Sequence, residues 1–452
     1  MANKNISVAD RSLFSLSGPI LIDLLLHFST PLINIFMVGR LSTSYLAAMT
    51  AGNQIFNLCI TVFSFISVGC SVVISQYLGA RRTEKAVKAI HIAIAFNFLI
   101  GLSFALLLFF FGYLGLELVN TPPEIIDDSF MYLHILGICL IPEAASLIMA
   151  ACLRVYGKAY SAMVVTIIAN VLTITGNIIV LYGFFGLPQL GLIGVAWSTV
   201  FGRVVSVILL GLIMSHGLRI RFRLKDFVHW SSDLLRKILH IGLPAAGENM
   251  VWSLHYITAG TAFVGLLGTV ALASQALYFQ LALFMMMFGS AISIGNEIQV
   301  GYLVGEKRFE EAYRRTFRSL RLGISVTLLV VLLFWLLRYP IMNVMSNDPQ
   351  VIATVLPLFV LSICLEPGRT INIIMVNALR ASGDAKFPLY MAFIFMWGVS
   401  IPLGYFLAIK MEMGLIGIWL GFLCDEWLRG LANALRWKSR RWQSKRLDVD
   451  SE

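Results

Sequence analysis

The sequence predicts an all-α integral membrane protein of twelve transmembrane helices, built as two six-helix halves. Three observations predict it: the composition, the regular alternation of apolar segments with polar breaks, and an internal repeat. Of the 452 residues, 58% are hydrophobic and 13% are charged, whereas soluble domains are about 45–50% apolar and about 25% charged. Such a chain has too little polar surface to face water on every side, so a bilayer is the solvent that its composition predicts.

Apolar segments long enough to cross a bilayer, which takes about 20 residues, recur along the whole chain. The first twelve residues are polar and lack the short apolar core and cleavage site of a signal peptide, so we expect the first span to be retained. The predicted spans are residues 13–37, 46–77, 87–113, 129–153, 161–184, 190–214, 240–265, 270–302, 319–340, 351–379, 387–409 and 414–435.

Basic residues concentrate in the two ends of the chain and in every second break. The opposite breaks contain only Arg40, Arg338 and Lys410 of the 34 lysines and arginines. Because Lys and Arg favour the cytoplasmic side, we expect a multi-pass protein of the cytoplasmic (inner) membrane with both termini in the cytoplasm. The net charge of +10 then belongs to the membrane surface, and a nucleic-acid partner is not expected.

The two halves of the chain repeat each other. The segment ICLIPEAASLIMAACLRVYG resembles ICLEPGRTINIIMVNALRASG, which pairs Arg154 with Arg380, and QYLGARR resembles GYLVGEKR, which pairs Gly79 with Gly305. Both pairs are separated by the same number of residues. Six spans per half is an even number, so both halves insert with the same topology, as parallel repeats do.

The longest polar break separates the two halves. The sequence therefore predicts an N-terminal six-helix lobe over residues 1–215, a cytoplasmic linker over 216–238, and a C-terminal six-helix lobe with a basic cytoplasmic tail over 239–452.

The first span, which contains GPILIDLLLHFSTPLIN, has one polar face. Asp23, His27, Thr30 and Asn34 stand at the spacing of a single helix face in an otherwise apolar segment. A charged side chain at mid-membrane costs roughly 2.5–3.5 kcal/mol on insertion scales, so it persists where it meets water or a partner. We interpret this face as a proton- or cation-binding site. The alternative is a purely structural role, in which Asp23 and His27 pair with each other inside the bundle and bind no transported ion.

The repeat places a second acid at the same position of the second half, because Pro19 aligns with Pro244 and Asp23 with Glu248. The prolines remove backbone hydrogen bonds and can bend a helix. The candidate residues for ion coupling are Asp23, Glu248, His27 and Asn34. The candidates for substrate binding are Glu248, Trp252, His255, Asn249, Tyr256 and Met250, and those for helix bending are Pro19, Pro31 and Pro244.

Other polar groups in the spans favour structural roles. Glu366 and Arg369 are one helical turn apart and are expected to form a local ion pair. Glu143 and Glu297 lie near predicted span ends, where solvation is expected to be inexpensive. A further candidate ion pair joins Arg203 of the sixth span to Asp425 or Glu426 of the twelfth.

No catalytic or cofactor motif occurs in the sequence. The six cysteines lack metal-ligand spacing, GYLVGEKR lacks the spacing of a phosphate-binding loop, and no soluble segment is long enough for a nucleotide-binding domain. We therefore expect no cofactor, no metal and no enzyme activity. Work on a substrate would draw on an ion gradient.

Two further segments are informative: LAAMTAGNQIFNL at the second span and ALRASGDAKFP after the tenth. Together with the twelve spans, the two halves and the proline-bearing first span with its acid, they resemble the multidrug and toxic compound extrusion (MATE) family over nearly the whole chain. The resemblance implies a secondary transporter that exports organic, often cationic, compounds in exchange for protons or sodium. It also implies two lobes that form a V around a central cavity.

The chain departs from that family at two positions. Many members carry an acid where this chain has Asn34, and the sodium-coupled bacterial branch carries one where it has Trp252. The ion-coupling residues are therefore predicted from this chain's own repeat, and proton or sodium both stay open. We expect a monomeric antiporter in the bilayer that exports a small organic substrate. The alternatives are a lipid-linked precursor flippase of the same superfamily and an exporter of an anionic aromatic metabolite.

Overall fold

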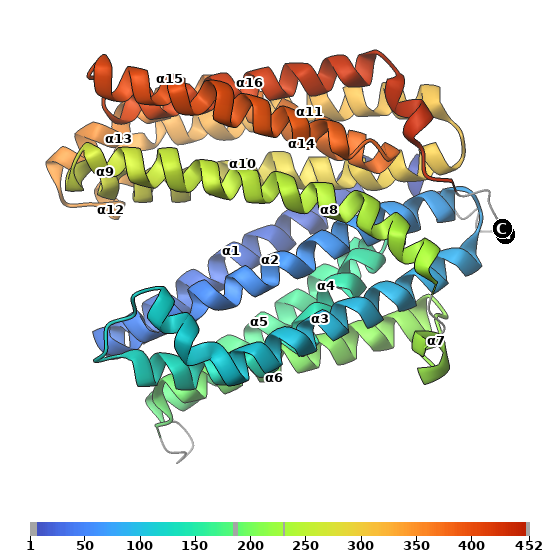
Figure 1. The fold of residues 1–452 in the computed structure, drawn as a ribbon, viewed down its shortest axis with the longest axis horizontal. Coiled ribbons are helices and arrows are strands. Elements are labelled where there is room, and N and C mark those ends of the chain that lie inside the picture. Colours follow the sequence, from blue (N-terminus) through green and yellow to red (C-terminus); the bar gives the residue numbers. More distant parts are fainter. Residues whose placement is uncertain (1–6, 184–188, 229–230, 449–452) are drawn as a thin grey trace. The chain divides into compact units, whose positions relative to one another are not determined.

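The computed structural model describes residues 7–183, 189–228 and 231–448, and within these ranges the regular structure is entirely helical (Figure 1). Ten of its helices are long and apolar enough to cross a membrane. Two more polar helical stretches, α8 (Ser232–His255) with its continuation and α16 (Leu415–Lys438), complete the predicted twelve. The predicted all-α architecture of two six-helix halves is thereby confirmed.

The observed helices coincide with the predicted spans and extend most of them by a few residues. Those of the first half are α1 (Leu13–Leu41), α2 (Thr43–Gly79), α3 (Thr83–Leu118), α4 (Ile126–Val155), α5 (Ala159–Tyr182) and α6 (Gly191–Leu212) with η3 (Ile213–Gly217). Those of the second half are α8 with η4 (Tyr256–Phe263) and α9 (Val264–Leu266), α10 (Thr269–Gly305), α11 (Phe309–Leu336), α13 (Pro349–Ser382), α14 (Lys386–Phe395) with η5 (Met396–Ser400), α15 (Ile401–Tyr405) and η6 (Phe406–Lys410), and α16.

The ninth predicted span, 319–340, differs most from the structure. Helix α11 begins at Phe309, and α12 (Arg338–Met345) is a separate short helix. The segment EEAYRRTFRSLR at the start of α11 is too polar for a hydropathy pattern to include, but polar residues continue a helix well. Three further short elements are η1 (Val8–Asp10), α7 (Leu224–Val228) in the predicted linker and η7 (Arg441–Lys445) in the tail. Residues 229–230 of that linker lie outside the described part.

The chain forms two compact units. One contains Leu243–Glu452 with the segments Met1–Leu21 and Ser75–Arg81, and the other contains Ile22–Ile74 and Arg82–Gly242. In the first, α10 packs on α11 and α13, and α13 packs on α16; in the second, α4 packs on α3, α5 and α6 (Figure 1). Each unit buries its own apolar core along these helix contacts.

π-Helical segments occur in both halves: η3 follows α6 in the first half, and three more lie in the second. Helix α8 changes to a π-helix directly after His255, and η5 and η6 interrupt the eleventh predicted span. π-Segments inside α-helices are rare and frequently accompany functional sites. Helix α1 is one α-helix across both Pro19 and Pro31, so bending at these prolines stays a prediction.

The ends of α2 and α10 approach each other closely within the first unit. A Cβ atom on Gly79 would lie 2.2 Å from the carbonyl oxygen of Tyr302, and one on Gly305 would lie 2.2 Å from that of Gln76. Gln76 and Tyr302 occupy the same position in the two repeats, as the glycines do. The two repeat-related helix ends therefore cross with their backbones in contact, which requires glycine on both sides.

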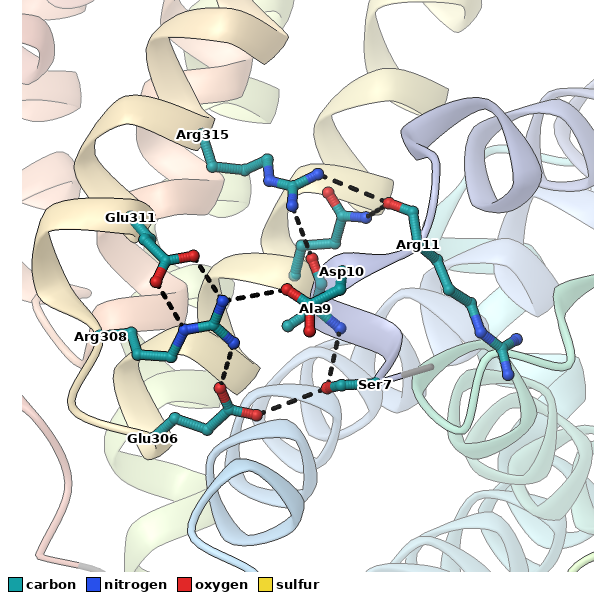
Figure 2. Close-up of polar contacts among 9 residues, drawn as sticks. Ser7, Ala9, Asp10, Arg11, Glu306, Arg308, Glu311 and Arg315 are labelled. Carbon is teal, nitrogen blue, oxygen red and sulfur yellow. Dashed lines mark hydrogen bonds and ion pairs between the residues drawn. The ribbon is translucent and has the colours of Figure 1, made fainter. Parts of the chain in front are cut away.

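The N-terminal segment is tied to the second half of the chain by one arginine. The Arg308 guanidinium group lies 3.0 Å from Asp10, 2.6 Å from Glu306 and 2.5 Å from Glu311, and Figure 2 shows these contacts. The hydrogen bonds that Arg308 donates to Glu311, Glu306 and Asp10 raise its pKa above the usual range. This arginine therefore stays charged and holds η1 against the start of α11.

A buried ion pair joins equivalent helices in each half, with its charges exchanged. In the first half Glu143 of α4 contacts Arg203 of α6 at 3.0 Å. In the second half Arg369 of α13 contacts Glu426 of α16 at 3.2 Å. Arg203 and Glu426 align in the repeat, whereas Glu143 and Arg369 lie in the same turn, one and two residues after a shared proline. Both halves keep an ion pair at this place, but the helix that carries the acid in one half carries the arginine in the other. This indicates that the pair holds the two helices together.

These contacts correct two expectations. Arg203 pairs with Glu143 rather than with Asp425 or Glu426, because the partner comes from its own half. Glu143 and Glu297 are not solvated at span ends: they are 3% and 7% exposed, because α6 packs on α4 and α13 packs on α10.

The reversed charges of the two halves predict that the acid and the arginine of the Glu143–Arg203 pair can exchange positions. Glu143→Arg or Arg203→Glu alone places like charges together in a buried site and should cost about 3–5 kcal/mol of stability. The double variant, which copies the polarity of the second half, should recover much of that loss. Melting temperatures of the four proteins in detergent form a double-mutant cycle that measures it. A double variant no more stable than the worse single variant would contradict the interpretation.

Candidate functional site

Each half contains an ion pair between its first and fourth predicted spans. In the first half, Arg154 of α4 donates to Asp23 of α1 over 3.0 Å. In the second half, Arg380 of α13 donates to Glu248 of α8 over 2.8 Å. The repeat aligns the two acids with each other and the two arginines with each other. The feature shared by the two halves is therefore a carboxylate–guanidinium pair of fixed polarity, and each pair lies within one compact unit.

These four side chains are largely removed from solvent. Asp23 is 4% exposed as a residue, and the side chains of Arg154, Glu248 and Arg380 are 22%, 12% and 11% exposed. Removing one partner of such a pair leaves an uncompensated buried charge, which is costly. The predicted lone carboxylates are thus neutralised by arginine. A proton or cation that binds either acid has to compete with its arginine.

His27 and Asn34 have local partners on the polar face of α1. His27 Nδ1 lies 2.9 Å from the Asp23 carbonyl oxygen and 3.7 Å from its carboxylate, and the His27 side chain is 42% exposed. Asn34 accepts a hydrogen bond of 2.9 Å from Asn177 of α5. The position where the MATE resemblance places an acid therefore holds a neutral amide pair, so Asp23 is the carboxylate on this face.

Trp252 and Tyr256 belong to an aromatic stack with Phe279 of α10. The rings of Trp252 and Tyr256 are 5.8 Å apart at 13°, and those of Tyr256 and Phe279 are 4.2 Å apart at 33°. The stack borders a cavity of about 30 Å³ that Asp425 and Glu426 of α16 also line. Aromatic faces and carboxylates together form a surface that attracts organic cations.

The charged residues that line this cavity belong to a buried cluster of acids and arginines. Arg369 contacts Glu366 at 2.7 Å and Glu426 at 3.2 Å, and Arg429 contacts Asp425 at 2.6 Å and Glu426 at 3.1 Å. The predicted Glu366–Arg369 pair is confirmed. Arg429 was missed, although its four-residue spacing from Asp425 is a signal for an ion pair on a helix. Among these residues, three carboxylates face two guanidinium groups, so the acids outnumber the arginines.

The remaining second-half candidates point to different neighbours. His255 is buried and its Nε2 lies 2.9 Å from the Ser400 hydroxyl of η5. Asn249 donates to the Ala245 carbonyl within α8, and Met250 is 65% exposed. The structure therefore does not gather the predicted stripe around one point: Glu248 joins Arg380, and His255 joins Ser400.

Comparison with known proteins identifies the family of the chain. The MatE family model matches residues 19–179 and again 244–406, once in each half of the chain. Among curated proteins, the chain is 37% identical to the "Uncharacterized transporter YisQ" of Bacillus subtilis, over 96% of this chain and 95% of that one. It is 24% identical to the "Probable multidrug resistance protein YoeA" of the same organism, over 91% and 90%.

Solved structures share the fold. A MATE transporter in the straight conformation superposes with a TM-score of 0.87 at 17% identity, covering 97% of this chain and 98% of that one. The match of the family model in both halves, together with the relation to YisQ over nearly the full length, shows the family. The chain is a membrane transporter that belongs to the MatE (multidrug and toxic compound extrusion) family.

Proposed function

We propose that this transporter is a secondary active exporter of small organic cations, driven by a proton or sodium gradient across the cytoplasmic membrane. The observation that carries the proposal is the stack of Trp252, Tyr256 and Phe279 beside Asp425 and Glu426. The multidrug resistance names of relatives such as YoeA support export of organic compounds.

The charge of the second-half site favours a cationic substrate. A cation over an aromatic face gains roughly 0.5–2 kcal/mol, and the surplus carboxylate of the neighbouring cluster adds attraction. A planar aromatic cation satisfies both features. An anionic aromatic metabolite or a lipid-linked precursor would instead have to use the arginines, which are already paired with acids.

The ion pairs of fixed polarity supply a means of coupling. Binding of a proton or sodium ion to Asp23 or Glu248 would neutralise the carboxylate and release Arg154 or Arg380. Because each pair joins two helices of one half, release would free α1 from α4 or α8 from α13. Ion binding would in this way change helix packing, as alternating access requires.

The proposed topology and oligomeric state rest on the pattern of the amino-acid sequence. We propose cytoplasmic termini, a cytoplasmic linker over 216–238 between lobes 1–215 and 239–452, and a monomer in the inner membrane. The alternation of basic breaks along the chain supports this orientation.

Efflux of ethidium from a pump-deficient bacterial host tests the function as a whole. Cells that express the protein should lose ethidium faster than cells without it. An uncoupler, or removal of sodium, should abolish the difference and identify the ion. Export of an anionic dye but not of ethidium would favour the anionic alternative.

The Asp23–Arg154 pair predicts separate effects on coupling and on stability. Asp23→Asn leaves a buried arginine unpaired and should both lower the melting temperature and abolish ion-driven transport in proteoliposomes. In Asp23→Asn/Arg154→Gln the stability should largely return, because no lone charge remains, while transport should stay absent. Transport at the normal rate by the double variant would show that the pair is only structural.

The aromatic stack predicts a loss of affinity when its outer ring is removed. Trp252→Leu should raise the dissociation constant for ethidium roughly two- to thirty-fold, which corresponds to the energy of one cation–π contact. Equilibrium binding to the purified protein measures it. Trp197→Leu, which changes an exposed tryptophan of α6, serves as the control and should bind normally. Equal affinity of the Trp252 variant would remove the stack from the substrate site.

A further inference from the structure

Glu297 of α10 is a buried carboxylate that no ion pair neutralises among the described residues. It is 7% exposed, and its Oε1 has no hydrogen-bond partner. The adjacent Asn296 is fully buried, and both of its amide atoms also lack partners. An ionised carboxylate in such surroundings is strongly disfavoured unless something neutralises it. A bound proton satisfies the requirement and needs no additional space.

Arg380 of α13, which donates to Glu248, also reaches the face of α10 that carries Glu297: it donates to Asn377, and Asn377 donates over 2.8 Å to Ser293, one turn before Glu297. Arg380 donates from Nη2 to Glu248 over 2.8 Å and from Nη1 to Asn377 over 3.2 Å, while its buried Nε has no partner. Helix α11 also packs on α10, and the hydroxyl of its Ser319 is buried without a hydrogen-bond partner. Arg380 is therefore bound to one carboxylate and linked through Asn377 to the helix turn before the other, and it retains an unused donor while Glu297 retains an unused acceptor.

The first half lacks this second acid. Glu297 lies eight residues before Gly305, and the residue at the same interval before the equivalent Gly79 is Ser71. The Asp23–Arg154 pair is therefore balanced. Its counterpart, Glu248–Arg380, has one carboxylate in excess. The asymmetry lies within a repeat that otherwise keeps the pair, which indicates a function added to the second half.

We propose that Glu297 is a proton-binding site and that Arg380 is shared between Glu297 and Glu248. While Arg380 is bound to Glu248, Glu297 carries a proton. When a cation, organic or H+, takes the place of Arg380 at Glu248, the guanidinium group turns its free Nε–H to Glu297. The proton of Glu297 then leaves to water. One cation is bound and one proton is released, so the charge of the site is unchanged, as exchange requires. The link to export rests on the proposed function; protonation of Glu297 does not.

Infrared difference spectroscopy of the purified full-length protein tests the protonation directly. At neutral pH the wild-type protein should show the C=O band of a protonated carboxyl group, which Glu297→Gln should lack. Glu248→Gln should also lose the band, because Arg380 is then free to turn to Glu297 and displace its proton. Glu143→Gln, which changes another buried glutamate, should keep it. A band that persists in Glu297→Gln, or in Glu248→Gln if the former does not fold, would overturn the proposal.

Proton release on binding tests the exchange. Ethidium added to weakly buffered wild-type protein should release about one proton per molecule bound, reported by a pH-sensitive dye. Glu297→Gln should bind ethidium and release none, whereas Glu143→Gln should release as the wild type does. Equal release by Glu297→Gln would overturn the exchange. If the wild type binds no ethidium, the proposed function fails on this substrate, while the infrared result still decides the state of Glu297.

Discussion

A charge buried among apolar helices has to be neutralised within reach of its own side chain. This constraint accounts for much of the polar architecture of the chain. Solvation is lost when a carboxylate enters the bundle, and only a closely placed partner with good geometry returns a comparable energy. Helix α4 provides such partners in the first half, with Arg154 for α1 and Glu143 for α6, and α13 does the same in the second. These two helices are thereby fixed to the helices on either side.

The transmembrane segments were predictable because a long apolar helix leaves a direct signature in the sequence. The acids of the site were also predictable, since Asp23 interrupts such a segment and the repeat places Glu248 at the same position. Their arginine partners were not identified, although the repeat aligned them equally well. Arg154 lies in the last turn of α4, next to a basic break, where an arginine has the appearance of an anchor at the membrane surface.

The remaining errors concern the ends of helices and the packing between helices. Hydropathy marks the apolar part of a helix, whereas the backbone continues to hydrogen-bond for several turns beyond it. Glu143 and Glu297 were assigned to a solvated boundary because hydropathy does not show which residues neighbouring helices cover, and the packed helices bury both. The partner of Arg203 was assigned to the wrong half, because charge complementarity alone does not distinguish one acid from another at a long sequence separation. Packing within the bundle makes that choice.

The ion pairs of the first half join α1 to α4 and α4 to α6, all of which are synthesised before the second half exists. During translation, the arginine partner of each paired acid of this half is therefore present once the first six helices have been made. The second half likewise supplies the arginines for its own paired acids. A nascent chain can hence release its first six helices into the lipid as a neutralised group. Because of the duplicated architecture, the two six-helix halves can insert into the membrane one after the other, each with the partners of its own paired acids.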